Sequence, residues 1–203
     1  MAERPAFVDN GKVIDIHAHF ASPDVLSQTY ETSSFARNVA QKSQSGKASP
    51  LPEKILEQLT DERARLLEMD RMGVDIQIVS PSILHQCTYD FDVNTGLAID
   101  RSSNRSLVDL IARHPDRLSG LGSLPMQDVE VACKELDFIV NELGLKGVII
   151  GSFIKGMELG DAYFRPFWQH ASDLGAVVFI HPSGNTDPRL AKHRLLISVG
   201  QPL

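Results

Sequence analysis

The sequence has little cysteine and no long basic or apolar run. Its only cysteines are Cys87 and Cys133. They stand too far apart for a Cys-x-x-Cys metal motif, and two are too few for the disulfide framework of a small secreted protein. We expect both to be reduced thiols, which leaves other side chains to carry any chemistry.

Negative charge slightly exceeds positive charge along the chain. Twenty Lys and Arg against 26 Asp and Glu give a formal net charge of −6 at pH 7, and no basic cluster typical of nucleic-acid binding is present. The sequence also lacks the roughly 18 consecutive apolar residues of a membrane span and, at its start, the apolar stretch of a secretory signal. These absences predict a cytoplasmic protein without nucleic-acid or membrane partners.

The overall composition is that of a folded protein. Hydrophobic residues make up 42% and charged residues 23% of the 203 residues, close to the averages for soluble domains. This length suits one domain, so residues 1–203 are predicted to form a single globular unit.

Short β-rich segments alternate with amphipathic segments from residue 13 onward. The predicted strands are residues 13–17 (VIDIH), 74–80 (VDIQIVS), 118–124 (LSGLGSL), 146–150 (KGVII) and 177–181 (VVFIH). Several are almost continuously apolar, which is typical of parallel strands covered on both faces. The alternation predicts an α/β fold with helical crossovers.

Four amphipathic segments are predicted to be the helices. They span residues 53–71, 94–114, 128–143 and 161–174. Asp128 and Asp161 suit the start of a helix, and Gly144 and Gly175 suit the left-handed turn that ends one.

Residues 20–52 interrupt this alternation. They contain the stretch QKSQSGKASP and follow neither the strand period nor the helix period. Long loops of this kind in compact domains are frequently functional lids or disordered. We predict an insertion that forms a partly mobile lid over the carboxyl ends of the strands.

Histidines end two of the predicted strands. His17 and His19 are two residues apart, so both rings project from one face if the strand continues. His181 ends the strand at residues 177–181 and therefore lies at the same end of a parallel sheet. Neutral imidazole is a good ligand for zinc and related ions. The three side chains predict a metal site, and the structural alternative is a set of hydrogen-bonded histidines.

Other polar residues near these strand ends are weaker candidates. Asp15 shares the face of the histidine pair and either accepts a hydrogen bond from a ligand imidazole or forms a structural salt bridge. His85 and His193 follow the second and fifth strands and could meet a substrate. His114 is interpreted as a helix cap, and His170 as a solvated helix residue.

Several segments, in order, resemble the amidohydrolase-related decarboxylases. They are VIDIHAHF, LLEMDRMGVDIQIVSPS, NRSLVDLIARHPDRLSGLGSLPMQD, ELGLKGVIIGS and FWQHASDLGAVVFIHP. That family includes aminocarboxymuconate semialdehyde decarboxylase and γ-resorcylate decarboxylase, beside related hydrolases. The resemblance covers nearly the whole chain from residue 13, apart from the insertion.

This resemblance implies a (β/α)8 TIM barrel that binds one divalent ion, usually zinc and in some members manganese. The His-x-His pair of the family corresponds to His17 and His19, and its fifth-strand histidine corresponds to His181. The family's late aspartate ligand, and its proton-carrying histidine in a His-Gly-Gly motif, have no counterpart in this sequence. About five strand-helix units are present where a barrel has eight, so we expect a barrel shortened at its carboxyl-terminal end.

The resemblance also implies a function. It indicates a metal-dependent decarboxylase whose substrate is a small aromatic or unsaturated carboxylic acid. A metal-dependent hydrolase of a lactone or amide is one alternative, and a catalytically incomplete metal-binding fragment is another. Arg37, in the long insertion, is a weak candidate for binding the substrate carboxylate. Unpaired outer strands favour a homo-oligomer, and this chain alone is expected to be inactive.

Overall fold

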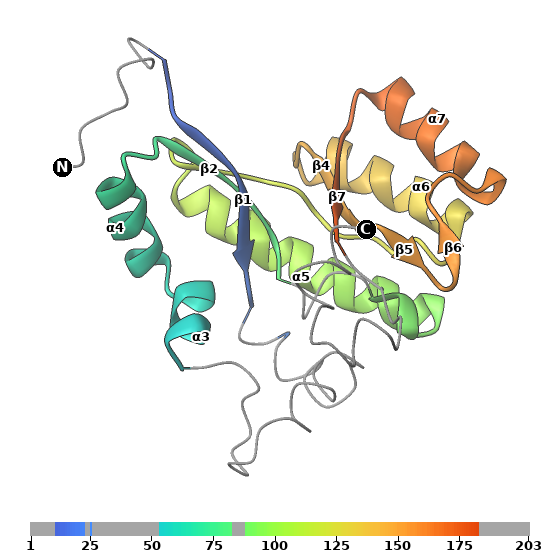
Figure 1. The fold of residues 1–203 in the computed structure, drawn as a ribbon, viewed down its shortest axis with the longest axis horizontal. Coiled ribbons are helices and arrows are strands. Elements are labelled where there is room, and N and C mark those ends of the chain that lie inside the picture. Colours follow the sequence, from blue (N-terminus) through green and yellow to red (C-terminus); the bar gives the residue numbers. More distant parts are fainter. Residues whose placement is uncertain (1–10, 23–24, 26–52, 83–87, 183–203) are drawn as a thin grey trace, which may run out of the picture.

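The computed structural model describes residues 11–22, 25, 53–82 and 88–182, which form the predicted α/β fold (Figure 1). In chain order its elements are β1 Ile14–Phe20, α3 Glu53–Thr60, α4 Glu62–Met72, β2 Ile76–Pro81, η1 Thr88–Asp90, α5 Val93–Arg113, β3 Leu118–Gly120, α6 Val129–Asp137, η2 Phe138–Glu142, β4 Gly147–Gly151, β5 Phe153–Ile154, β6 Met157–Glu158, η3 Ala162–Phe164, α7 Arg165–Leu174 and β7 Val177–His181. In the part of the chain described here, no helix is both long and apolar enough to span a bilayer.

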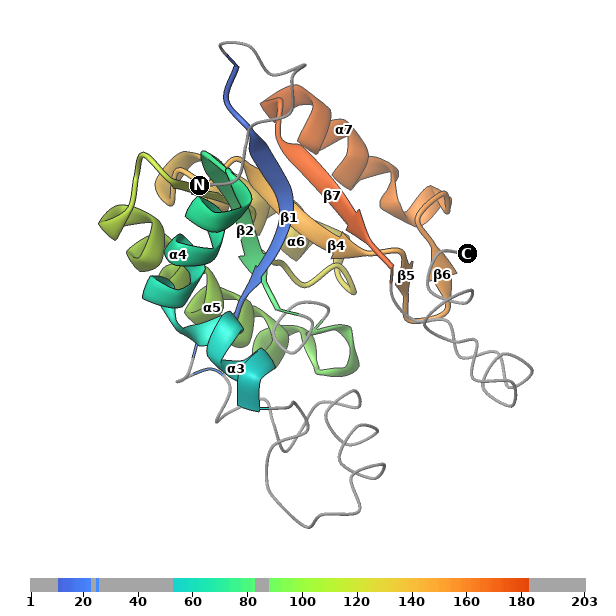
Figure 2. The same ribbon diagram turned by 60° about the vertical axis from the view of Figure 1, so that its left-hand side comes forward.

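Five strands lie side by side in the order in which they occur along the chain. β1, β2 and β3 pair in parallel, as do β4 and β7. The two ladders meet where Gly122, just after β3, bridges Val148 of β4. The N–H of Gly122 also donates to the carbonyl of Gly147 at 2.9 Å. Helical crossovers connect the strands, and the helices lie around the outside of the sheet (Figures 1 and 2).

The sheet is strongly curled. Flat strands spaced by about 4.8 Å would hold the first and fifth strands roughly 19 Å apart. Instead, the rings of His17 on β1 and Phe179 on β7 have centroids 5.0 Å apart. The inner faces of the first and last strands therefore meet, and Figure 2 shows β1 and β7 side by side.

The core lies between the strands and the surrounding helices. Val148 and Ile150 of β4 are fully buried there. The largest fully buried side chains on the helical side are Met69, Leu107, Leu110, Leu136, Ile139, Phe164 and Phe167. Burial of these apolar surfaces fixes each helix against the sheet and supplies the main stabilising free energy.

The predicted helix over residues 53–71 is wrong in one respect, because it is broken into α3 and α4. Asp61 sits at the break with extended backbone, and its Oδ1 accepts from the N–H groups of Arg63 at 2.8 Å and Ala64 at 3.0 Å. An aspartate that caps the following helix satisfies these orphan donors better than it would in a helix interior. Gly175 ends α7 in the left-handed conformation, as predicted.

The largest differences from the predicted strands concern β1, β3 and one additional hairpin. β1 continues to Phe20 instead of ending at residue 17, and β3 ends at Gly120 instead of residue 124. The hairpin of β5 and β6 was not predicted at all. Lys155 and Gly156 form its turn with φ angles of 48° and 88°, and a lysine with positive φ is uncommon in turns of this kind.

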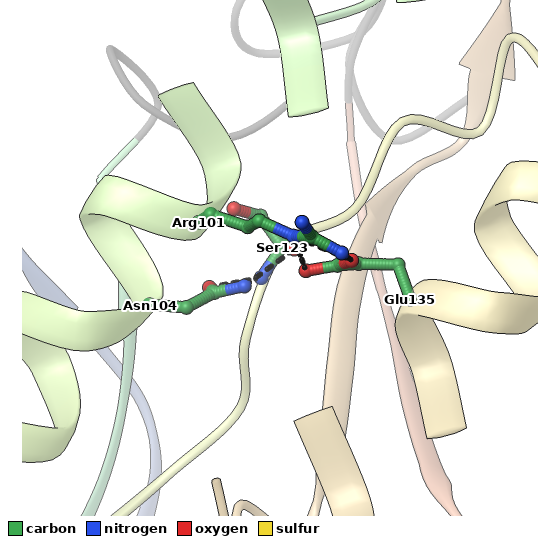
Figure 3. A network of polar contacts seen from close by, with 4 residues as sticks. All are labelled: Arg101, Asn104, Ser123 and Glu135. Atoms are coloured by element: carbon green, nitrogen blue, oxygen red, sulfur yellow. Dashed lines mark hydrogen bonds and ion pairs between the residues drawn. The ribbon is translucent and has the colours of Figure 1, made fainter. Parts of the chain in front are cut away.

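Asn104 on α5 is hydrogen-bonded to the segment that follows β3 (Figure 3). The Asn104 amide donates to the carbonyl of Ser123 at 2.8 Å and accepts from the N–H of the same residue at 2.8 Å. Beside it, the Arg101 guanidinium donates to one carboxylate oxygen of Glu135 on α6 at 2.9 and 2.7 Å. This network joins α5, the end of β3 and α6 on the side where the strands present their carboxyl ends.

Candidate metal centre

His17 and His19 both lie within β1, which continues past the predicted end. Their Nε2 atoms are 3.1 Å apart. The register between β1 and β2 shifts between Asp15 and Ala18, which marks a bulge that includes His17, the first residue of the pair. Bulges re-aim side chains near functional sites, and here the two imidazoles converge on one point.

His181, the last residue of β7, completes the cluster from the other edge of the curled sheet. Its ring centroid lies 5.3 Å from that of His17 and 5.1 Å from that of His19. One nitrogen from each of the three residues lies within 4.8 Å of the other two. The structure thus brings together the three predicted ligands, although they come from the first and last strands of the sheet.

In His19 and His181, hydrogen bonds to Nδ1 fix which ring nitrogen carries the proton. Nδ1 of His19 lies 3.2 Å from the Pro81 carbonyl and 3.2 Å from the Ser80 hydroxyl, which itself donates to the Ala18 carbonyl. Nδ1 of His181 lies 3.0 Å from the Pro182 carbonyl. A carbonyl can only accept, so each Nδ1 carries the proton and each Nε2 keeps its lone pair. Metal-binding histidines are oriented in the same way.

Burial keeps the imidazoles of His19 and His181 neutral. It lowers the pKa of His19 to about 4, and the neighbouring rings of His181 and His17 add to the effect. Burial also lowers the pKa of His181. Desolvation disfavours the charged form of an imidazole, and the neutral form is the one that binds metal.

The spacing of the cluster fits a single small cation. Two nitrogen ligands at about 2.0–2.1 Å from one zinc ion lie roughly 3.0–3.4 Å from each other. The Nε2 atoms of His17 and His19 already have this separation. Three imidazole ligands leave further coordination positions open, which is typical of catalytic rather than structural sites.

Asp15 meets neither of the two predicted kinds of partner directly. Its Oδ2 accepts from the Gln77 amide at 2.8 Å, and its Oδ1 accepts from the backbone N–H of His17 at 3.1 Å. Gln77 in turn accepts from the Arg65 guanidinium at 2.7 Å. The carboxylate is therefore linked to a cation through an amide, and it contacts the backbone of His17 rather than an imidazole.

Arg65 is a residue of this region that the sequence did not reveal. It is 9% exposed although it lies on α4, and it also donates to the carbonyl of His19 at 2.5 Å. Arginines on amphipathic helices are usually solvated, so no sequence pattern predicted that Arg65 is buried. Its guanidinium supports the backbone of β1 directly beside the histidine pair.

The remaining candidates divide into two groups. Arg37, His85 and His193 lie outside the described residues, as do residues 23–24 and 26–52 of the predicted lid. His114 is the carboxyl-terminal cap of α5, as predicted. The interpretation of His170 as a solvated residue is wrong in part, because the ring is half-buried and its Nε2 lies 3.0 Å from Asp137 Oδ1.

Comparison with known proteins gives the family. The amidohydrolase (Amidohydro_2) model matches residues 14–200. The chain belongs to this amidohydrolase family. It is 37% identical over 122 residues to 2-amino-3-carboxymuconate-6-semialdehyde decarboxylase from Dictyostelium discoideum, a match that covers 60% of the chain and 34% of that relative. It is also 29% identical over 182 residues to gamma-resorcylate decarboxylase from Polaromonas sp., covering 85% of the chain and 50% of that relative.

A solved structure places the amidohydrolase chain within a larger fold. 5-Carboxyvanillate decarboxylase from Novosphingobium aromaticivorans, complexed with manganese and 4-hydroxy-3-methoxy-5-nitrobenzoic acid, is 25% identical with a TM-score of 0.75. The match covers 95% of this chain and 55% of that one. The chain thus spans about half the length, or less, of the relatives it matches. Its curled parallel sheet is part of a TIM barrel, which confirms the predicted fold.

Proposed function

We propose that the protein is a metal-dependent decarboxylase of an aromatic or unsaturated carboxylic acid. In this proposal His17, His19 and His181 hold one divalent ion. The observation that carries it is the convergence of three imidazoles at the carboxyl ends of parallel strands. Active sites of barrel enzymes form at that end, and the relatives named above are decarboxylases.

Both zinc and manganese suit the donor set. Imidazole nitrogens bind zinc readily, whereas manganese is the ion in the solved relative from Novosphingobium aromaticivorans. A divalent ion held there supplies Lewis-acid polarisation and an electrostatic anchor for a substrate carboxylate.

Residues of this chain orient the imidazoles of the proposed site. The carbonyls of Pro81 and Pro182 hold the protons of two imidazoles on the side away from the cluster. The burial that keeps His19 neutral also lowers the local dielectric constant, which strengthens electrostatic interactions with a bound carboxylate. Arg37, His85 and His193 stay candidates for contact with that substrate.

Product analysis tests the proposal. The protein that carries this chain, loaded with Zn²⁺ or Mn²⁺, is incubated with 2,6-dihydroxybenzoate or 2-amino-3-carboxymuconate semialdehyde, and released CO₂ is measured. We expect release that disappears in His181→Ala and persists in His170→Gln, a matched change of a histidine outside the cluster. Opening of a lactone or amide without CO₂ would instead identify the hydrolase alternative.

A further inference from the structure

A tyrosine is hydrogen-bonded to the strand end that faces His181. Tyr89 lies in η1 and is 6% exposed. Its phenol oxygen accepts from the backbone N–H of Gly151 at 3.0 Å. Gly151 is the last residue of β4, and it pairs in register with His181 on β7. The phenol therefore contacts the backbone directly beside a proposed metal ligand.

The phenol takes the place of a missing strand partner. On one side of β4, the N–H of Ser152 donates to the carbonyl of His181 at 2.9 Å. On the other side, the N–H of Ile149 donates to Gly122 at 2.8 Å. Gly151 stands two residues beyond Ile149, so its N–H points to the same side. β3 and its bridge have ended there within the described chain, and Tyr89 satisfies a buried donor that would otherwise be costly to leave unpaired.

The helical turn that carries Tyr89 is itself anchored. The Thr88 hydroxyl donates to Asp100 on α5 at 2.9 Å, and Asp100 also accepts from the Ser123 hydroxyl at 2.9 Å. Gly96 permits a close approach, because a Cβ there would lie 3.1 Å from the Thr88 hydroxyl oxygen. The tyrosine thus projects from a support that is tied to α5 and to the segment after β3.

We propose that Tyr89 is a positioning residue of the metal centre, holding the end of β4 and, through the paired strand, the backbone of His181. This inference rests on the proposed function. His17 and His19 are placed by β1, whereas His181 comes from the far edge of the sheet. The distance between the two groups depends on how β4 and β7 end, and Tyr89 fixes that end from the β3 side.

The experiment measures Zn²⁺ affinity by isothermal titration calorimetry on the 203-residue chain. Zn²⁺ is chosen because it binds imidazole more tightly than Mn²⁺ does. Tyr89→Phe keeps the ring and removes the acceptor, and we expect Zn²⁺ binding roughly tenfold weaker, as for other groups that support a metal ligand. Tyr163→Phe is the matched control. The Tyr163 ring is 45% exposed and its hydroxyl donates to the Gln127 carbonyl, so affinity should stay within about twofold.

A double-mutant cycle separates positioning from a general loss of stability. In a His181→Ala background there is no imidazole left to position, so Tyr89→Phe should change Zn²⁺ affinity by less than about twofold. In a His17→Ala background the roughly tenfold effect should remain. A merely structural role would weaken both backgrounds equally and would overturn the inference.

Two further results are decisive. If the wild-type chain binds no Zn²⁺, the proposed metal site fails and the inference fails with it; if the wild type and Tyr89→Phe bind Zn²⁺ equally, only the inference fails. Should Tyr89→Phe not fold, Thr88→Val keeps the phenol and cuts the link to Asp100. It should weaken Zn²⁺ binding about threefold, and unchanged affinity would overturn the inference.

Discussion

His17 and His181 have ring centroids 5.3 Å apart although they stand on the first and the last strand of the sheet. This contact is possible because the sheet curls until the inner faces of β1 and β7 meet. The proposed ion would therefore bridge the two edges of the fold, and its binding should stabilise the curled form over any more open one.

Replacement of His181 by alanine should abolish tight metal binding. The variant keeps the pair on β1 but loses the nitrogen from the far edge, so we expect Zn²⁺ affinity to fall by more than about 100-fold, beyond the loss typical of outer contacts. The increase in melting temperature on adding Zn²⁺ should shrink with it. Calorimetry and thermal unfolding measure these two quantities.

His170→Gln is the control for that prediction. His170 has a half-buried ring like that of His19, but it contacts Asp137 on α6 instead of the cluster. The control should bind Zn²⁺ like the wild type. Equal losses in His170→Gln and His181→Ala would point to a general effect of removing histidine.

Part of the proposed site could be predicted from sequence because short-range periodicity determines it. The spacing of His17 and His19 places both on one face of a strand, and an apolar run ending in His181 places that residue at the carboxyl end of another. Strand direction then brings the three together without knowledge of any helix packing.

The supporting residues could not be predicted, because their roles depend on long-range packing. Arg65 reads as a solvated helix residue, yet its guanidinium donates to the carbonyl of His19 on β1. Tyr89 follows no period, and its partner Gly151 lies on a strand that occurs much later in the chain. Asp61 is compatible with a helix interior and with a cap, and only the direction of the chain after Thr60 decides between them.

Arg65→Lys should weaken the support of the β1 backbone beside His19 without removing any proposed metal ligand. One ammonium group cannot reproduce the planar fork that reaches both the Gln77 amide and the His19 carbonyl. We expect the free energy of unfolding to fall by about 1–3 kcal/mol, the cost of leaving buried polar groups unpaired. Zn²⁺ affinity should fall as well.

Urea denaturation with and without Zn²⁺ measures both effects. Arg63→Lys is the matched control, because Arg63 is exposed on the same helix. Its free energy of unfolding should stay within about 0.5 kcal/mol of the wild type. A similar result for Arg65→Lys would refute the supporting role of its guanidinium.

Asn104→Ala should destabilise the segment after β3. The side chain satisfies both the N–H and the carbonyl of Ser123, and both residues are almost fully buried (Figure 3). Two unpaired backbone groups should cost about 2–4 kcal/mol in the free energy of unfolding. Arg105→Ala, an exposed change on the next position of α5, provides the comparison, and chemical denaturation of both variants should separate them clearly.

Asp100 should make stability fall as pH rises toward neutrality. The carboxyl is completely buried, and burial raises its pKa from 3.8 to about 7, although hydrogen bonds from Thr88 and Ser123 oppose the shift. The folded state thus binds a proton more tightly than the unfolded state does. The stabilising effect of that proton is complete below about pH 4 and is lost as pH increases through about 7.

Asp100→Asn isolates this contribution, because an amide stays neutral at every pH in the window. Its carbonyl can still accept one hydroxyl, and the other hydroxyl can rotate to accept from the amide N–H. Between pH 4 and 7 the free energy of unfolding of the wild type should fall relative to that of the variant, by an amount on the order of a few kcal/mol. Urea denaturation of both proteins at several pH values across this window gives the difference directly, and other titrating groups cancel from it. If the two curves ran parallel throughout, Asp100 would titrate alike in the folded and unfolded chains, and its burial would have no consequence for stability.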